Sequence, residues 1–168
     1  MKPRSLLVAS TILLLSAVAA QAGPNPGGGR ARLPDLVITQ FGLASWGKCV
    51  DRQPAFTFTV TVKNQGAASW TGDSKVYVRD LKHANWFTVV ELAPIAAGAT
   101  RTVNVPIDYS ADPQIMVPGQ AHPFQATVNE APHMPVESDY ANNAGPGPAT
   151  YEGKEVIMVT LPKDCTLK

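Results

Sequence analysis

The stretch AFTFTVTVKNQG, residues 55–66, decides the fold class of this chain. Apolar residues alternate with polar ones along it: Phe56, Phe58, Val60 and Val62 against Thr57, Thr59, Thr61 and Lys63. Side chains alternate between the two faces of an extended segment, so this pattern predicts an antiparallel strand with one buried face. The residues that follow, Asn64-Gln65-Gly66, favour a turn.

Six further segments repeat this pattern, with Gly, Pro, Asn and Asp clusters between them: Leu33–Phe41, Ser74–Leu81, Asn85–Leu92, Thr100–Tyr109, His122–Glu130 and Lys154–Pro162. No segment combines a 3.6-residue apolar stripe with a helix cap. Seven short strands without a helix predict an all-β protein, a single immunoglobulin-like (fibronectin-III-like) antiparallel β-sandwich.

The first 22 residues have the three parts of a secretory signal peptide. Lys2 and Arg4 form a basic start, residues 6–19 are apolar and uncharged, and Ala20-Gln21-Ala22 supplies a cleavage motif. The apolar run is short for a membrane-spanning helix. We expect cleavage after Ala22, a flexible Gly/Pro-rich leader over 23–32, and one domain over 33–168. The mature chain is predicted to be periplasmic or secreted and to have no membrane span.

Charge and motifs exclude several classes of function. Without Lys2 and Arg4, the 14 basic residues fall to 12, against 13 acidic ones. A near-neutral chain has no electrostatic reason to bind nucleic acid. The sequence contains no Gly-x-Ser-x-Gly nucleophile motif, no Gly-rich phosphate loop and no HExxH zinc motif. We therefore predict that the protein is not an enzyme and needs no cofactor.

The two cysteines, Cys49 and Cys165, are predicted to form a disulfide, because an even count in an oxidising compartment favours one. A nucleophilic cysteine is the competing interpretation, but no base or orienting group lies near either residue in the sequence. Closing a loop of this length would stabilise the fold by about 4–5 kcal/mol. The pair is expected to be structural.

Metal binding has only a weak signal in the sequence. His83, His122 and His133 are dispersed and lack the close spacing of zinc ligands, so they predict no metal site. Calcium is an alternative at Glu137 and Asp139, because calcium takes carboxylate and carbonyl oxygens. The loop lacks the carboxylate density of a dedicated calcium site.

Three tryptophans raise the question of carbohydrate binding, because sugars stack on flat aromatic faces. Trp46 and Trp86 are better explained as indoles that plug the ends of the sandwich, with their N–H groups bonded to loop carbonyls. For Trp70, in the polar stretch GAASWTGD, both interpretations stay open. Trp70 and Trp86 are the candidate ligand-binding residues.

Four segments, in order, carry a family resemblance: PDLVITQF, FTFTVTVKNQG, LAPIAAGATRTVNV and VNEAPHMPVESDYANN. Together they resemble the CARDB family, cell-adhesion-related domains found in bacteria, over roughly Leu33 to Leu161. The positions that match the family's pattern are Asn64, Gly66, Gly98, Glu137, Asn142 and Asn143. The resemblance implies an immunoglobulin-like or fibronectin-III-like sandwich in exported proteins, associated with adhesion or binding and without catalytic residues.

The stretch VESDYANNAG, residues 136–145, is predicted to be a structural corner. We expect Glu137, Asn142 and Asn143 to satisfy loop backbone groups, as Asn does in turns. The functional prediction is an exported, non-catalytic binding or adhesion module that recognises a protein partner in the periplasm or extracellular space. The alternative is a carbohydrate-binding accessory domain that uses the loop tryptophans.

Overall fold

The computed structural model describes residues 32–46, 55–83, 86–108, 119–129 and 136–160. Eight strands lie in these ranges: β1 (Leu36–Trp46), β2 (Ala55–Asn64), β3 (Ser74–Asp80), β4 (Phe87–Leu92), β5 (Thr100–Asp108), β6 (Ala121–Val128), β7 (Ala149–Tyr151) and β8 (Lys154–Thr160). No helix occurs in this part of the chain, and so none that is long and apolar enough to span a membrane.

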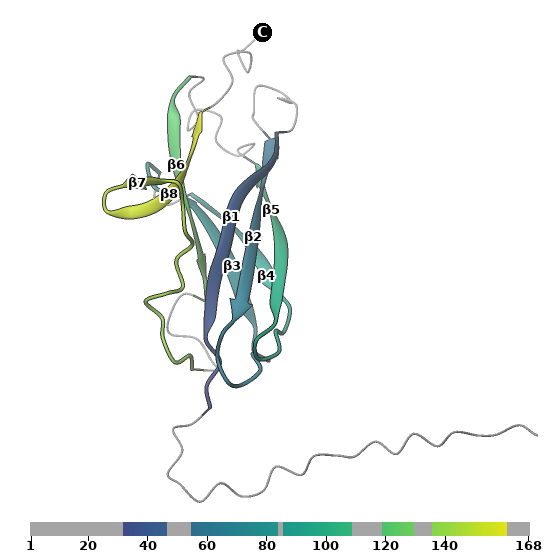
Figure 1. Ribbon diagram of the computed structural model, residues 1–168. Helices are drawn as coiled ribbons and strands as arrows, with labels where there is room; N and C mark the ends of the chain where they lie inside the picture. The colour runs from purple at the N-terminus through teal and green to yellow at the C-terminus, as the bar shows by residue number, and fades with distance from the viewer. Residues whose placement is uncertain (1–31, 47–54, 84–85, 109–118, 130–135, 161–168) are drawn as a thin grey trace, which may run out of the picture. The chain divides into compact units, whose positions relative to one another are not determined.

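The strands form two antiparallel sheets (Figure 1). One has the order β1-β2-β5, and the other has the order β4-β3-β6-β8-β7. The all-β sandwich predicted from the sequence is confirmed, with one strand more than the seven expected.

The deciding stretch becomes β2, the central strand of the three-stranded sheet. It pairs with β1 on one side and with β5 on the other. Phe56, Phe58, Val60 and Val62 are all buried, as their alternation predicted. The ring of Phe124 on β6 lies 5.6 Å from the ring of Phe56 and 5.1 Å from that of Phe58. These contacts join the two sheets through one core.

The additional strand, β7, forms a hairpin with β8. Tyr151 pairs with Lys154, so the loop contains only Glu152 and Gly153. Both loop residues have positive φ, 49° and 77°, which is the backbone of a tight primed turn. β7 was not among the predicted strands, because its three residues after the Gly/Pro-rich run at 145–148 are too few to show alternation. The Glu-Gly pair before Lys154 was the available signal.

The turn after β2 packs closely on the residues that precede β1. The side-chain oxygen of Asn64 accepts hydrogen bonds from the backbone N–H groups of Asp35 (3.1 Å) and Gly66 (3.1 Å). The amide nitrogen of Asn64 donates to the carbonyls of Ala68 (2.8 Å) and Ile95 (3.0 Å). One buried side chain therefore joins three separate segments.

This packing leaves no room for a side chain at Gly66. A Cβ there would lie 2.5 Å from the backbone nitrogen of Asp35. We expect Gly66→Ala to lower the free energy of unfolding by about 1–3 kcal/mol, because the backbone must shift to relieve the overlap. Gly42→Ala is the matched control, since nothing lies within 4 Å of a Cβ at Gly42. Urea denaturation of both variants tests this, and equal stabilities would contradict the expected overlap.

Candidate functional site

The segment 136–145 forms a hydrogen-bonded corner between β6 and β7, in which Glu137, Asn143 and Gly145 are buried. Glu137, which is 3% exposed, accepts through Oε2 from the backbone N–H of Leu36 (2.9 Å) at the start of β1. Its Oε1 accepts from the side-chain amides of Asn129 and of Asn143, the latter at 3.4 Å. Three donors therefore converge on one carboxylate. The Glu137 side chain ties the corner to β1 and to the residue after β6.

The two asparagines of the corner, Asn142 and Asn143, form further hydrogen bonds to backbone groups and to a carboxylate. The amide of Asn143 donates to the carbonyl of Asn129 at 3.3 Å, and the N–H of Val128 donates to the carbonyl of Asn143 at 3.0 Å. Asn142 donates its side-chain amide to the carboxylate of Asp35 at 2.9 Å. Glu137, Asn142 and Asn143 thus all bond to groups that are distant in sequence or belong to the loop backbone.

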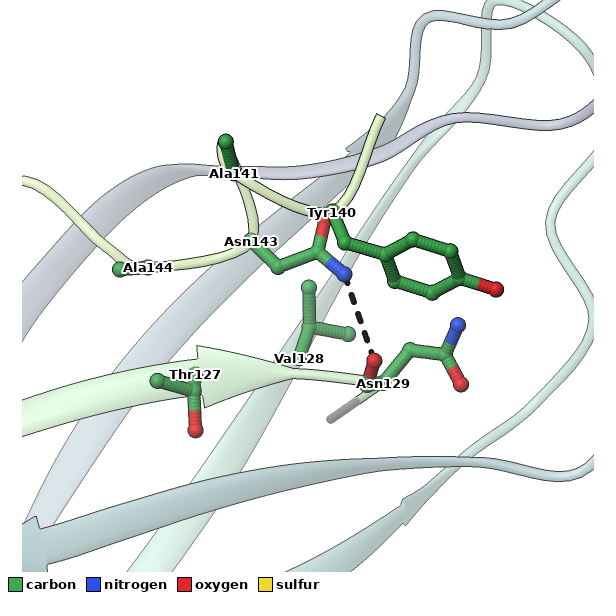
Figure 2. A pocket seen from close by; sticks show the side chains of 7 residues that line it. All are labelled: Thr127, Val128, Asn129, Tyr140, Ala141, Asn143 and Ala144. Atoms are coloured by element: carbon green, nitrogen blue, oxygen red, sulfur yellow. Dashed lines mark hydrogen bonds between the residues drawn. The ribbon is translucent and has the colours of Figure 1, made fainter. Parts of the chain in front are cut away.

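A pocket of about 270 Å³ opens beside this corner. It is lined by Thr127, Val128, Asn129, Tyr140, Ala141, Asn143 and Ala144. Figure 2 shows the Asn143 amide directed at the carbonyl of Asn129, with the ring of Tyr140 beside both. The side-chain amide nitrogens of Asn129 and Asn143 donate within the corner, whereas their side-chain oxygens have no hydrogen-bond partner among the described residues.

Burial of Glu137 raises the pKa of its carboxyl above the ordinary 4.5, although hydrogen bonds from Asn129, Leu36 and Asn143 oppose that shift. The nearby charge of Asp35 raises it slightly further. A raised pKa in the fold means that the folded state binds this proton more tightly than the unfolded state does.

Stability should therefore depend on pH through Glu137. The contribution of Glu137 is fully present below pH 4.5 and is lost as pH rises through its raised folded-state pKa. We expect the difference in the free energy of unfolding between the wild type and Glu137→Gln to become smaller as the pH rises from 4.5 through the folded-state pKa of Glu137. Urea denaturation at a series of pH values measures this difference, and a constant difference would contradict the raised pKa.

The calcium alternative involved two carboxylates that the structure gives different roles. Glu137 is buried, and both of its oxygens accept protein hydrogen bonds. Asp139 is exposed and accepts the backbone N–H of Ala141 at 2.8 Å, which is a local turn contact. The structure therefore places these residues in a corner and in a turn.

The tryptophan interpretation needs correction at Trp70. Its side chain is 0% exposed and is the largest of the fully buried ones. Its backbone exchanges hydrogen bonds with Ile95 at 2.8 and 3.0 Å. The indole therefore presents no face to a sugar, because the short bridge to Ile95 holds this loop residue in the core. Its Nε1 has no hydrogen-bond partner among the described residues. Trp86 is partly buried and packs against the same core.

A cluster that the sequence analysis missed lies where β3 ends. Oδ2 of Asp80 is 2.9 Å from Nδ1 of His122 on β6 and 3.0 Å from Nδ1 of His83 in the turn after β3. The two imidazole rings stack, with centroids 5.6 Å apart. Asp80 and His122 have 0% side-chain exposure, whereas His83 has 37%. His83 and His122, which are dispersed in the sequence, therefore lie side by side in the fold.

The strand register explains why the sequence concealed this cluster. β3 pairs with β6 so that Asp80 lies opposite Phe124, two residues from His122. Residues two apart in a strand share a face, so His122 points inward with Phe124. Asp80 and His122 are 42 positions apart in sequence, and no local motif links them. An inward-facing histidine in a strand was the only available signal.

Hydrogen bonding governs the ionisation of Asp80. Burial alone would raise the pKa of its carboxyl, but hydrogen bonds from His122, His83 and the Lys82 backbone N–H outweigh burial and hold the pKa below the ordinary 3.8. The carboxylate is therefore the stable form in the fold. An ionised Asp80 faces two imidazole nitrogens.

The opposite face of β3 and the adjoining β4 carry a partly exposed patch of aromatic, aliphatic and cationic side chains. We call it the β3–β4 patch: Tyr77, Arg79, Phe87 and Val89. Phe87 is 46% exposed and Val89 is 41% exposed. Arg79 lies opposite Phe87 in the register, and Tyr77 lies opposite Val89. The guanidinium of Arg79 is 4.8 Å from the ring centroid of Phe87 and 5.4 Å from that of Tyr77. The aromatic rings and the cation therefore form one continuous surface.

Several predicted residues lie outside the described part of the chain. These are the disulfide pair Cys49 and Cys165, the third histidine His133, and the signal peptide and leader. Each of them stays a prediction.

One family model and several solved structures match this chain. The sequence model of the CARDB family matches residues 33–145. The chain is similar to a crystal structure of a CARDB domain from Pyrococcus furiosus in complex with di-metal ions. The identity is 17% and the TM-score 0.50, and the match covers 79% of this chain and 97% of that one. A search of curated proteins found no match.

Two further structures are less similar. A solution NMR structure of a CARDB domain from Pyrococcus furiosus has 16% identity and a TM-score of 0.48, with 79% and 98% of the two chains covered. A beta-glucosidase from Kluyveromyces marxianus has 16% identity and a TM-score of 0.36, and the match covers 77% of this chain but 14% of the glucosidase. Identities this low show the fold alone.

Proposed function

Because the chain belongs to the CARDB family, we propose that it is a non-catalytic module that binds a protein partner outside the cytoplasm. The family consists of non-catalytic domains that are typically extracellular or periplasmic. The observation that carries the choice of a protein partner is the exposed β3–β4 patch.

The composition of the patch suits a protein surface. Aromatic residues and arginine are enriched at protein interfaces and often dominate their binding energy. The Arg79 guanidinium lies over two rings, which limits its freedom before binding and so lowers the entropic cost of association. The neighbouring pair Lys75–Glu91, at 3.4 Å and largely exposed, supplies the charged rim that such interfaces have.

The carbohydrate alternative loses its main support, because the Trp70 indole is fully buried. Trp86 packs against the core, so it offers at most part of one ring face. Export itself is supported by the pattern of residues 1–22 and by the usual location of the family.

Site-specific photocrosslinking tests the partner-binding proposal. A photoreactive phenylalanine analogue at Val89 should form an adduct of defined mass in the native envelope. The same analogue at Thr102, an exposed position on β5 of the other sheet, is the control and should form none. Phe87→Ser should abolish the Val89 adduct while changing the free energy of unfolding by no more than about 0.5 kcal/mol, because Phe87 is exposed.

Adducts of equal yield at Val89 and Thr102, or an adduct that survives Phe87→Ser, would contradict the assignment of this face. The non-catalytic part of the proposal has a separate test. Turnover in a broad hydrolase panel that disappears in Asp80→Asn would overturn it, because Asp80 with His83 is the described pair most similar to a general base.

A further inference from the structure

We propose that Asp80, His83 and His122 bind a divalent transition-metal ion, through one carboxylate oxygen and two imidazole nitrogens. These ligand atoms all lie within 4.8 Å of one another. The site lies on the inward face of β3, whereas the β3–β4 patch lies on the outward face. The metal proposal is therefore independent of the proposed partner-binding function.

The surrounding backbone holds the donors in place. The N–H of Lys82 donates to Oδ1 of Asp80 at 2.9 Å, which leaves Oδ2 directed at the imidazoles. The turn that carries His83 is closed by Trp86 N–H to the His83 carbonyl at 2.7 Å. Leu81 N–H donates to the carbonyl of Pro123 at 2.9 Å, which fixes this turn against β6 beside His122. Ligands from the turn and from β6 are thus positioned before any metal arrives.

The donor spacing is close to that of a coordination polyhedron. Zinc–nitrogen and zinc–oxygen bonds are about 2.0–2.1 Å, so the ligand atoms of a tetrahedral zinc lie about 3.3 Å apart. The Asp80–His122 and Asp80–His83 separations, 2.9 and 3.0 Å, are a few tenths of an ångström shorter. The two histidine ligand atoms lie within 4.8 Å of each other, so rotation of the rings has to bring all three donors around the cation. In the bound form each metal-facing Nδ1 is deprotonated, so that its lone pair binds the metal.

The donor set also selects the metal. Imidazole nitrogen suits zinc, copper, nickel and iron, whereas calcium and magnesium take oxygen ligands. Three protein ligands leave a coordination position open. The His83 side chain is 37% exposed, so one ligand of the site lies at the surface. This site therefore differs in residues and in metal class from the calcium alternative at Glu137 and Asp139.

Two imidazoles converge on one carboxylate oxygen. The Nδ1 atoms of His122 and His83 lie 2.9 and 3.0 Å from the same Oδ2 of Asp80. One histidine would be enough to give that oxygen a hydrogen-bond partner, and the structure supplies two. A second convergent imidazole is what a metal site requires.

Calorimetric titration of the full chain, purified without a histidine tag, tests the proposal with zinc chloride. We expect one equivalent of zinc to bind, and cobalt to give the visible absorption of a tetrahedral complex. His83→Ala should weaken zinc binding by at least about tenfold, since loss of even an indirect ligand contact has an effect of this size. His83 is the residue of choice because its partial exposure makes a folding failure less of a risk than at Asp80 or His122.

Lys75→Ala is the matched control, because Lys75 lies on the same strand as Asp80 but has an exposed side chain that pairs with Glu91 at 3.4 Å. It should leave zinc binding unchanged. Imidazole nitrogen NMR provides a second measurement: zinc should shift the Nδ1 resonances of His83 and His122. The proposal is overturned if no zinc binds, if His83→Ala binds as tightly as the wild type, or if calcium competes equally.

Discussion

Trp70→Ala is expected to lower the free energy of unfolding by about 3–5 kcal/mol, the range for removing a large buried aromatic side chain. Trp70 is 0% exposed and lies in the same core as Phe58 and Phe124. The variant leaves a cavity that the two sheets fill only partly, because Ile95 holds the backbone at Trp70 through two hydrogen bonds. Urea denaturation, followed by circular dichroism, measures the loss.

Phe87→Ala is the control for this experiment. Both variants remove an aromatic ring from the same domain, but Phe87 is 46% exposed and Trp70 is not exposed at all. Phe87→Ala should change the free energy of unfolding by about 0.5 kcal/mol or less. If Trp70→Ala proved equally mild, Trp70 would not be a core residue in solution, and the carbohydrate interpretation would return.

Glu137→Gln is expected to lower the free energy of unfolding by about 3 kcal/mol, although the two side chains have nearly the same shape. Each oxygen of Glu137 accepts N–H groups, from Leu36 at one oxygen and from Asn129 and Asn143 at the other. Glutamine replaces one oxygen with an NH₂ group, which cannot accept a hydrogen bond, whereas both oxygens of a carboxyl group keep lone pairs in either protonation state. At least one buried N–H then loses its acceptor, because no water reaches a side chain that is 3% exposed.

The control for Glu137→Gln is Asp139→Asn, two residues away in the same corner. Asp139 is exposed, and asparagine keeps the oxygen that accepts the Ala141 N–H. This change should alter stability by about 0.5 kcal/mol or less. A similar midpoint of denaturation for both variants would show that the corner contributes through its backbone alone.

The sequence predicted most of the fold, because the fold depends on local alternation. Phe56 to Val62 indicated a buried face of β2, and the same pattern located β3, β4, β5, β6 and β8. β7 escaped because three residues are too few to show a period. The family resemblance is confirmed by the match over residues 33–145. The role of Glu137, Asn142 and Asn143 as a structural corner stays a prediction, which the hydrogen bonds of these side chains motivate.

The candidate sites could be predicted less well from the sequence, because each is formed by residues that are far apart in the chain. Nothing in GAASWTGD indicates that Trp70 is buried, since its neighbours are small and polar and Ile95 lies 25 positions away. The β3–β4 patch likewise needs the register that sets Arg79 against Phe87. Alternation within a strand predicts which of its residues lie on the same face of the sheet. It does not predict which residues of other strands lie beside them, because that depends on the strand register.

Sequence alone therefore determined the class of this protein: alternating strands, turn residues such as Asn64-Gln65-Gly66, and the family's ordered motifs. Each of these signals involves residues that are close together in the sequence, so a single sequence is enough to identify it. Tertiary structure alone decided where chemistry can occur. It placed Trp70 in the core, left Phe87 outside, and brought His122 to Asp80 across 42 positions. Strand pairing determines these positions. The register between strands that are far apart in sequence is set by the packing of the whole core, which no local pattern shows.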